Sequence, residues 1–287
     1  MTPAANGASG SVGQPSARSL ILDIYGAEIR ALGGWLSIAA LVALMADLGH
    51  DAQAVRTAVS RMKASNLLTA HTQDGVAGYR LTESGLEILR DGDERLFQAS
   101  APPGLEDGWV VAVFSVPEQS RDRRHRLRAL LIRLGFGQVT PGAWMAPSRM
   151  ETEARRLLDR AQLAQYVSLF QGEYRGCADI GTVAASAWDM GAIDRQYRDF
   201  STRHRRTARK WRARHRDNRR AFVDYMAVLA AWRPVAYQDP GLPGELLPAR
   251  WSGDAARGLF AELHATLAER AGSHVAAIIS ETRAEGR

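Results

Sequence analysis

The order of helix-like and strand-like segments predicts an α+β protein built from three parts. Residues 17–99 read as helix, helix, helix, hairpin and helix, and residues 108–178 read as strands that alternate with helices. Only helical periodicity follows in residues 179–287. Small residues and proline dominate residues 1–16, as in a disordered tail, and the Pro- and Gly-containing stretch 100–107 is expected to be a linker.

The first part has the element order of a winged helix-turn-helix domain. Apolar spacing predicts three helices, the second capped by Ser37 and the third by Asp51. A loop that contains Asp-Gly joins two strand-like pieces, residues 67–71 and 78–81, as in a β-hairpin. A fourth helix is expected to start at Thr82.

The middle part predicts a ferredoxin-like, or split βαβ, fold. A nearly continuous apolar strand covers Trp109–Val116, and Ser120 is expected to cap the helix that follows it. A strand pair near Val139 and residues 143–146, a second helix and a last strand at residues 166–170 complete the β-α-β-β-α-β order.

The C-terminal part contains an unusual concentration of arginine. Apolar and aromatic residues from Tyr197 to Trp232 recur at spacings of three or four, which predicts one long helical stripe through this run. Residues 195–220 hold twelve Arg or Lys against two Asp, whereas residues 17–99 hold eight basic and ten acidic residues. The net charge of the chain is +6. The local excess indicates a polyanionic partner.

The third predicted helix is the candidate DNA-reading element. Val55, Val59 and Met62 lie at i, i+4 and i+7 and should pack inward. The remaining polar side chains would then be free to reach base edges in a major groove. These are Arg56, Thr57, Ser60, Arg61 and Lys63. A merely solvated helix face is the alternative, and the hairpin that follows favours DNA recognition.

Two further groups of residues are candidate contacts to nucleic acid. In the predicted hairpin these are His71 and Arg80, although Arg80 fits a hairpin-stabilising role equally well. In the Arg-rich run they are Arg205, Arg206 and Arg209. That run could be a solvated helix face that pairs with acidic groups, a flanking DNA contact, or a cradle for ligand phosphates.

Four sequence pieces, in order, carry a resemblance to a known family. They are Val55-Arg-Thr-Ala-Val-Ser-Arg-Met, Tyr79-Arg-Leu-Thr-Glu-Ser-Gly, Gly108-Trp-Val-Val with Gly135-Phe-Gly-Gln-Val-Thr-Pro-Gly-Ala-Trp-Met-Ala-Pro, and Asp239-Pro-Gly-Leu-Pro-Gly-Glu-Leu-Leu-Pro. Across roughly residues 18–270 the chain resembles the PaaX-like family of bacterial transcriptional regulators, the phenylacetate repressors.

The resemblance implies a cytoplasmic, homodimeric repressor of an aromatic-acid catabolic operon. It would bind double-stranded operator DNA and be released by an aryl-acyl-CoA effector such as phenylacetyl-CoA. No cofactor, catalytic residue, metal ligand or membrane contact is expected. Four side chains are of types that suit an aryl-CoA, although each also suits core packing or an ion pair: Trp144, Arg175, Trp188 and Arg233.

The middle part also resembles the spacer-acquisition nuclease of CRISPR systems. That nuclease carries a metal-binding Asp near the end of its first strand, where this chain has Ser115. A neutral hydroxyl cannot replace a hard anionic oxygen ligand, so metal-dependent cleavage is not expected. The alternative to a repressor is therefore a non-catalytic nucleic-acid-binding or protein-scaffold module. The single Cys177 excludes an internal disulfide and fits a reducing compartment.

Overall fold

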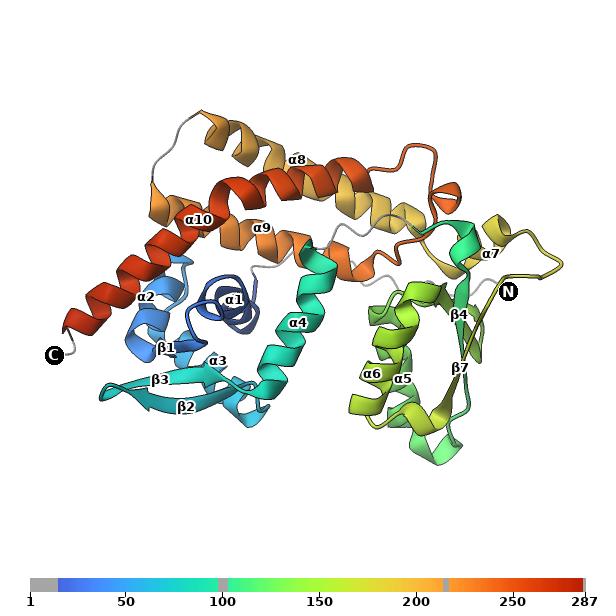
Figure 1. Ribbon diagram of the computed structural model, residues 1–287, viewed down its shortest axis with the longest axis horizontal. Coiled ribbons are helices and arrows are strands. Elements are labelled where there is room, and N and C mark those ends of the chain that lie inside the picture. The colour runs from blue at the N-terminus through green and yellow to red at the C-terminus, as the bar shows by residue number, and fades with distance from the viewer. Residues whose placement is uncertain (1–14, 98–102, 214–216, 286–287) are drawn as a thin grey trace. The chain divides into compact units, whose positions relative to one another are not determined.

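The computed structural model describes residues 15–97, 103–213 and 217–285. The described chain divides into two compact units. Unit 1 takes its residues from 1–90, 216–230 and 266–287, and unit 2 from 91–215 and 231–265. Helices accompany a β-sheet in each unit (Figure 1), so the predicted α+β class is confirmed. Most of the expected tail, residues 1–14, and part of the expected linker, residues 100–102, lie outside the described residues.

The first part of the chain follows the predicted order of elements, with one additional strand. Its elements are α1 (Ala17–Ile24), β1 (Trp35–Ser37), α2 (Ile38–Asp47), α3 (Ala52–Ala64), β2 (Leu68–Gln73), β3 (Val76–Leu81) and α4 (Glu83–Phe97). Both predicted caps are confirmed. The Ser37 hydroxyl accepts a hydrogen bond from the Ala40 N–H at 3.1 Å, and the Asp51 carboxylate accepts one from the Ala54 N–H at 2.7 Å.

The strands of this part form a three-stranded antiparallel sheet with the order β1-β3-β2. The hairpin between β2 and β3 is confirmed, and its turn residues Asp74 and Gly75 have φ angles of 52° and 78°. Two consecutive left-handed residues make the turn type whose twist matches paired strands. Strand β1 was not predicted, because three residues are too few to establish a strand periodicity.

The first helix continues beyond the end of α1 as a turn of π-helix at Tyr25–Ile29. Such widened turns are rare and are stabilised by tertiary contacts rather than by sequence preference. Here the Tyr25 hydroxyl donates a hydrogen bond to the Tyr79 carbonyl oxygen at 3.0 Å. The contact joins the first helix to strand β3.

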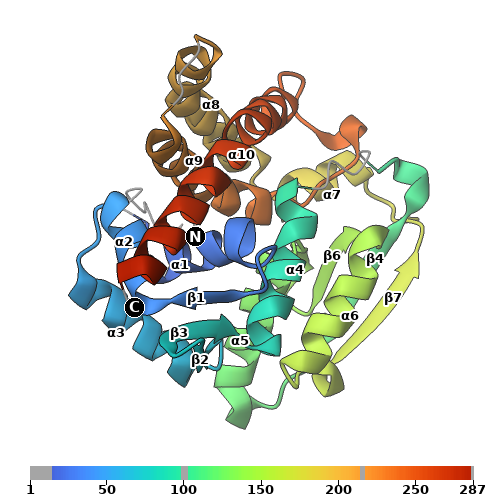
Figure 2. The same ribbon diagram turned by 60° about the vertical axis from the view of Figure 1, so that its left-hand side comes forward.

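The middle part contains the strands and helices in the predicted β-α-β-β-α-β order. They are β4 (Trp109–Phe114), α5 (Arg121–Arg133), β5 (Gly137–Thr140), β6 (Ala143–Pro147), α6 (Glu151–Arg160) and β7 (Val167–Gly172). The strands form a four-stranded antiparallel sheet with the order β5-β6-β4-β7. Helices α5 and α6 cover one face of this sheet (Figures 1 and 2), where Val110, Ala112 and Trp144 pack against Leu127 and Leu158.

The expected Ser120 cap is wrong. Ser120 ends a short 3-10 turn, Glu118–Ser120, and its hydroxyl makes no capping hydrogen bond to α5. The 3-10 turn itself leads the chain into the helix, so the first helical N–H groups need no side-chain acceptor from this residue.

The described elements after residue 179 are helical, as predicted. They are α7 (Ile180–Ala187), α8 (Met190–Arg212), α9 (Asn218–Gln238) and α10 (Gly253–Glu285), with a short 3-10 turn at Gly244–Leu246. Parts of α4, α9 and α10 belong to each unit. None of the described helices is both long and apolar enough to cross a membrane.

The single long stripe expected between Tyr197 and Trp232 is wrong, because the Arg-rich run is divided between α8 and α9. Helix α8 ends at Arg212, and the Asp217 carboxylate accepts a hydrogen bond from the Arg220 N–H at 2.9 Å at the start of α9. Inward-facing residues resume in α9 with the same spacing, so the apolar pattern did not reveal the break. His215, which the expected stripe included, lies outside the described residues.

Candidate nucleic-acid interface

Helix α3 is held in unit 1 by one apolar face. Val55, Val59 and Met62 are 0%, 2% and 0% exposed, as their spacing predicted. Ala58 completes this face at 8% exposed. Burying a side chain of the size of Val or Met contributes about 1.5–3 kcal/mol, so this face determines which side of the helix turns outward.

The opposite face of α3 is exposed and carries every residue predicted there. The exposed side chains are Arg56, Thr57, Ser60, Arg61 and Lys63. Helix α3 contains no Asp or Glu, and among the described residues its three cationic side chains have no carboxylate partner. The surface is therefore locally positive although residues 17–99 together carry more acidic than basic groups.

Three carboxylates of unit 1 contribute less free negative charge than the sequence alone indicates. Asp47 accepts hydrogen bonds from Arg219 and His274, each at 2.6 Å, and Glu83 pairs with Arg90 at 2.7 Å. Burial raises the pKa of Glu28 to about 7, so this carboxyl is only partly ionised near neutral pH. These acidic groups are thus paired or partly neutral.

The end of α3 is connected to the start of α4 by a contact between Asn66 and Thr82 that the sequence did not predict. Asn66 adopts a left-handed conformation with φ 54°, and the Leu67 N–H donates to the Met62 carbonyl at 2.9 Å. The Thr82 hydroxyl then donates to the Asn66 carbonyl oxygen at 2.6 Å. The tolerance of Asn for left-handed backbone was the available signal. These contacts hold the backbone after α3 against the start of α4.

Tyr79 makes a further contact that the sequence did not predict. The Lys63 ammonium lies 5.9 Å from the centre of the Tyr79 ring, a cation–π contact between α3 and strand β3. Tyr79 pairs with Ala70, whereas Arg80 pairs with Thr69 and His71 pairs with Gly78. Successive residues of a strand point to opposite faces. His71 and Arg80 are both exposed, but they lie on the other face of the hairpin from the Lys63 contact.

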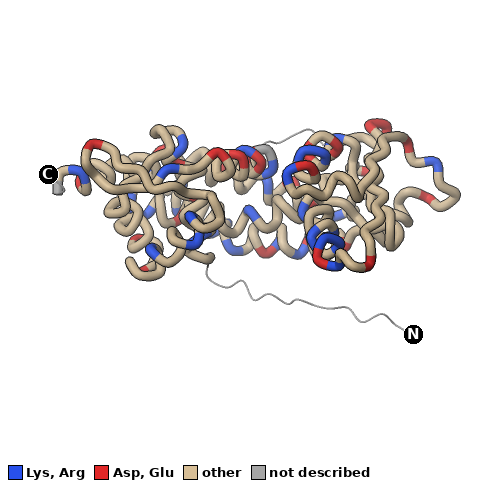
Figure 3. Tube along the Cα trace, turned by 90° about the horizontal axis from the view of Figure 1, so that it is seen from below, with Lys and Arg blue, Asp and Glu red and all other residues tan. Residues whose placement is uncertain are grey.

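The predicted flanking contacts lie in unit 2. Arg205, Arg206 and Arg209 are exposed on α8, whose inner face buries Tyr197, among others. Lys and Arg occur along the traces of both units (Figure 3).

The two tryptophans considered for an acyl-CoA lie on opposite faces of the four-stranded sheet, and Arg233 lies in α9. Trp144 is 3% exposed and lies in the core between the four-stranded sheet and its helices. Trp188 packs on the other face of that sheet, where its ring centre lies 6.2 Å from that of Trp109. Arg175 is exposed and pairs with Glu173 at 2.6 Å. The two tryptophans therefore cannot line one pocket.

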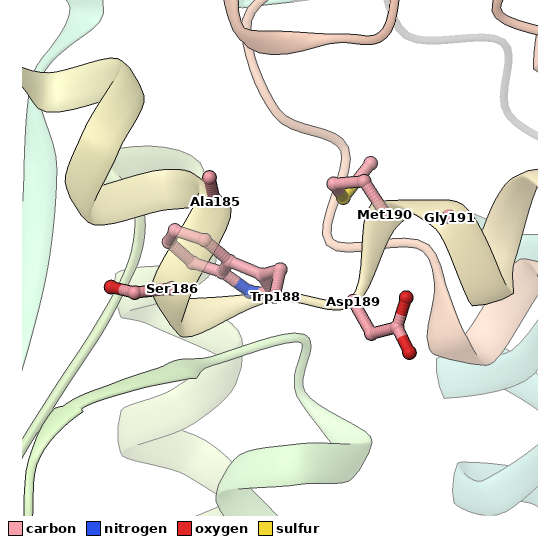
Figure 4. A pocket seen from close by; sticks show the side chains of 6 residues that line it. All are labelled: Ala185, Ser186, Trp188, Asp189, Met190 and Gly191. Carbon is pink, nitrogen blue, oxygen red and sulfur yellow. The ribbon is translucent and has the colours of Figure 1, made fainter.

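Trp188 lines a pocket of about 340 Å³ that is open to solvent (Figure 4). The Asp189 carboxylate beside it accepts a hydrogen bond from the Ala192 N–H at 2.8 Å. The Trp188 indole N–H already donates to the Gly135 carbonyl oxygen at 2.9 Å. A carboxylate at the rim disfavours an anionic ligand, so this pocket gives no support to a CoA site.

Comparisons with known proteins match three successive segments of the chain to one family. The family profile described as "PaaX-like protein" matches residues 16–85, "PaaX protein central Cas2-like domain" matches residues 102–184, and "PaaX-like protein C-terminal domain" matches residues 188–277. The three matches follow each other in the order of the sequence. The chain belongs to the PaaX-like family.

Two individual proteins are similar over most of their length. Transcriptional repressor PaaX of Escherichia coli K12 is 27% identical over 261 residues, which cover 89% of this chain and 82% of the repressor. A solved structure, the uncharacterized protein Rv0674 from Mycobacterium tuberculosis, is 23% identical and has a TM-score of 0.59. That match covers 91% of this chain and 97% of the other, and it indicates a shared fold.

Proposed function

We propose that this protein is a DNA-binding transcriptional repressor whose unit 1 contains a winged helix-turn-helix domain. The observation that carries the proposal is the exposed face of α3, which has three cationic side chains, two hydroxyls and no acidic residue. The name of the similar Escherichia coli protein, a transcriptional repressor, supports the same partner.

In this proposal α3 enters the major groove of the operator. A helix of 13 residues is about 20 Å long, and the major groove admits one α-helix. Arg56 and Thr57 lie nearer its N-terminal end, from which recognition helices contact base edges. Lys63 lies in the last turn beside the hairpin and would contact a phosphate. Ser60 and Arg61 lie between these positions, and His71 and Arg80 would contact the backbone or the minor groove.

The middle part is proposed to be a ferredoxin-like domain without catalytic activity. Its β-α-β-β-α-β order and the strand order β5-β6-β4-β7 support this fold. At the end of its first strand Ser115 is exposed and has only a neutral hydroxyl to offer a metal ion. This favours a regulator over a metal-dependent nuclease.

Release by an acyl-CoA, the homodimer, the cytoplasmic location and an aromatic-acid operon remain parts of the proposal that rest on family membership. No pocket is assigned to the effector. Titration of CoA thioesters, phenylacetyl-CoA among them, against the operator complex tests the response. A thioester that lowers DNA affinity at stoichiometric concentration supports it, and an unaffected complex across the panel contradicts it.

Footprinting on the DNA upstream of the protein's own gene tests the repressor proposal against the scaffold alternative. A repressor that binds as a homodimer should protect a discrete palindrome, because operator symmetry mirrors protein symmetry. A scaffold should coat the duplex uniformly in a salt-sensitive manner. Uniform coating would therefore reject the repressor.

A further inference from the structure

Helix α8 presents a cluster of cationic side chains for which the described part of the chain supplies no carboxylate partner. We call Arg203, Arg205, Arg206, Arg209 and Lys210 the α8 cationic surface. All five are exposed. Within the described residues none of them pairs with a carboxylate. Two neighbours on the same helix do, since Arg198 pairs with Asp194 at 3.0 Å and Arg212 with Glu262 at 2.6 Å.

A second arginine-rich helix of unit 2, α5, shows that this pattern is not a general property of the composition. Each of its five N-terminal arginines donates a hydrogen bond within the unit. The acceptors are Glu118 for Arg121 and Arg124, the Tyr166 hydroxyl for Arg123, the Ala161 carbonyl for Arg126 and Gln138 for Arg128. If a high arginine content alone explained the pattern, the arginines of both helices would have partners to the same extent. Among the described residues, none of the five cations of the α8 cationic surface makes a hydrogen bond of this kind or an ion pair.

The arrangement is electrostatically unfavourable in the isolated protein. Arg203 and Arg206, Arg205 and Arg209, and Arg206 and Lys210 are like-charged pairs at spacings of three or four. Like charges at these spacings repel each other and destabilise a helix. Two of the cations lie in the last turn of α8, where the helix dipole offsets part of this repulsion. A bound polyanion would offset the rest of the repulsion between these cations.

The spacing of these charges fits a nucleic-acid backbone. Residues 203–210 rise about 10 Å along the helix. Duplex DNA carries a negative charge about every 1.7 Å of its axis, so several phosphates fall within that length. We propose that the α8 cationic surface binds the phosphate backbone of duplex DNA and adds sequence-independent affinity to the contacts of α3. The choice of duplex DNA as the partner rests on the proposed function.

A charge-neutral variant tests this surface. Arg203, Arg205, Arg206 and Arg209 are replaced together by Gln, which retains helix propensity. The matched control replaces Arg121, Arg123, Arg126 and Arg128 of α5 by Gln, which changes the net charge equally. A third variant places Lys at the four α8 positions. Far-UV circular dichroism establishes that each variant is folded.

The measurement is the dependence of log Kobs on log salt concentration, for the operator duplex and for a random-sequence duplex. The α8 Gln variant should lose about 2–4 units of slope on both duplexes, since each phosphate contact contributes about 0.9. The Lys variant and the α5 control should keep the wild-type slope. An unchanged slope in the α8 Gln variant, or an equal loss in the α5 control, overturns the proposal.

The test of the α8 cationic surface can fail without the proposed repressor function failing, and the reverse also holds. The α8 Gln variant should retain the wild-type preference for operator over random DNA, because that preference is assigned to α3. A wild-type protein without such a preference rejects the repressor, while the slope on random DNA still decides the role of α8. A variant that weakens CoA-thioester binding but leaves the DNA slope unchanged assigns the surface to ligand phosphates and overturns DNA binding there.

Discussion

The carboxylate of Asp47 lies 2.6 Å from the imidazole Nε2 of His274, although the two residues are 227 positions apart. The other oxygen of the same carboxylate accepts a hydrogen bond from Arg219 at 2.6 Å. Asp47 ends α2, Arg219 lies in the first turn of α9, and His274 belongs to α10. A single side chain therefore joins the candidate DNA-binding region to segments from the C-terminal third of the chain.

Replacing Asp47 by Ala should lower the free energy of unfolding by about 2 kcal/mol. The side chain is 13% exposed, and its loss leaves the largely buried His274 without its partner. Arg219→Gln should lower it much less, because Arg219 is 65% exposed and water can replace the contact. Urea unfolding followed by circular dichroism compares the variants. Equal effects of the two substitutions would contradict the assigned roles.

The stability of unit 1 should fall as the pH rises through about 7. Burial raises the pKa of Glu28 to about 7 in the folded protein, from an ordinary value of 4.5. The folded state then binds this proton more tightly than the unfolded chain does. The contribution is fully present below about pH 4.5 and is lost as the pH rises toward and through 7.

Glu28→Gln should therefore be more stable than the wild type at pH 8, by about 2–3 kcal/mol, and the difference should vanish near pH 4.5. Thermal unfolding across this pH range measures it. Asp51→Asn serves as a control, since Asp51 is exposed and its amide can still cap α3. A gap between Glu28→Gln and the wild type that is independent of pH would argue against the raised pKa.

Much of unit 1 could be predicted because its signals are local. The spacing of Val55, Val59 and Met62 identified the outward face of α3, and the caps at Ser37 and Asp51 located two helix starts. Each of these follows from residues within two turns of one another.

What could not be predicted depends on contacts between distant residues. Strand β1 forms because Trp35 pairs with Arg80 of strand β3. Three residues are too few to show a strand periodicity in the sequence. The break between α8 and α9 preserved the apolar spacing on both sides. The pairing of Asp47 with His274 depends on which distant side chains lie near each other. So does the lack of a carboxylate partner for the α8 cationic surface among the described residues.

Gly78→Ala should destabilise the sheet of unit 1. A Cβ at this position would lie 2.5 Å from the Leu36 carbonyl oxygen and 2.7 Å from the Trp35 ring. Such overpacking against backbone lowers the free energy of unfolding by about 1–3 kcal/mol. Ala77→Ser, at the exposed neighbouring position, is the matched control. If both variants unfold at the same urea concentration, the close approach of β1 to β3 is not supported.

Lys63→Gln should weaken DNA binding without changing its sequence preference. The Lys63 ammonium lies near the Tyr79 ring at the end of α3, a position suited to one phosphate. The salt dependence of log Kobs should become less steep by about 0.9, and Lys63→Arg should keep the wild-type value. A changed preference among operator variants would instead assign Lys63 to base recognition.

The reading of base sequence by α3 is tested most directly by Arg56→Ala, assayed on the operator and on its full set of single base-pair substitutions. We expect a loss of about 1–3 kcal/mol on the operator and a relaxed preference at one base pair, with little change on random DNA. Arg90→Ala, which removes an exposed arginine of unit 1 paired with Glu83, should behave as the wild type. If Arg56→Ala discriminates among the substituted operators as the wild type does, Arg56 does not read the operator and the proposed role of this face is contradicted.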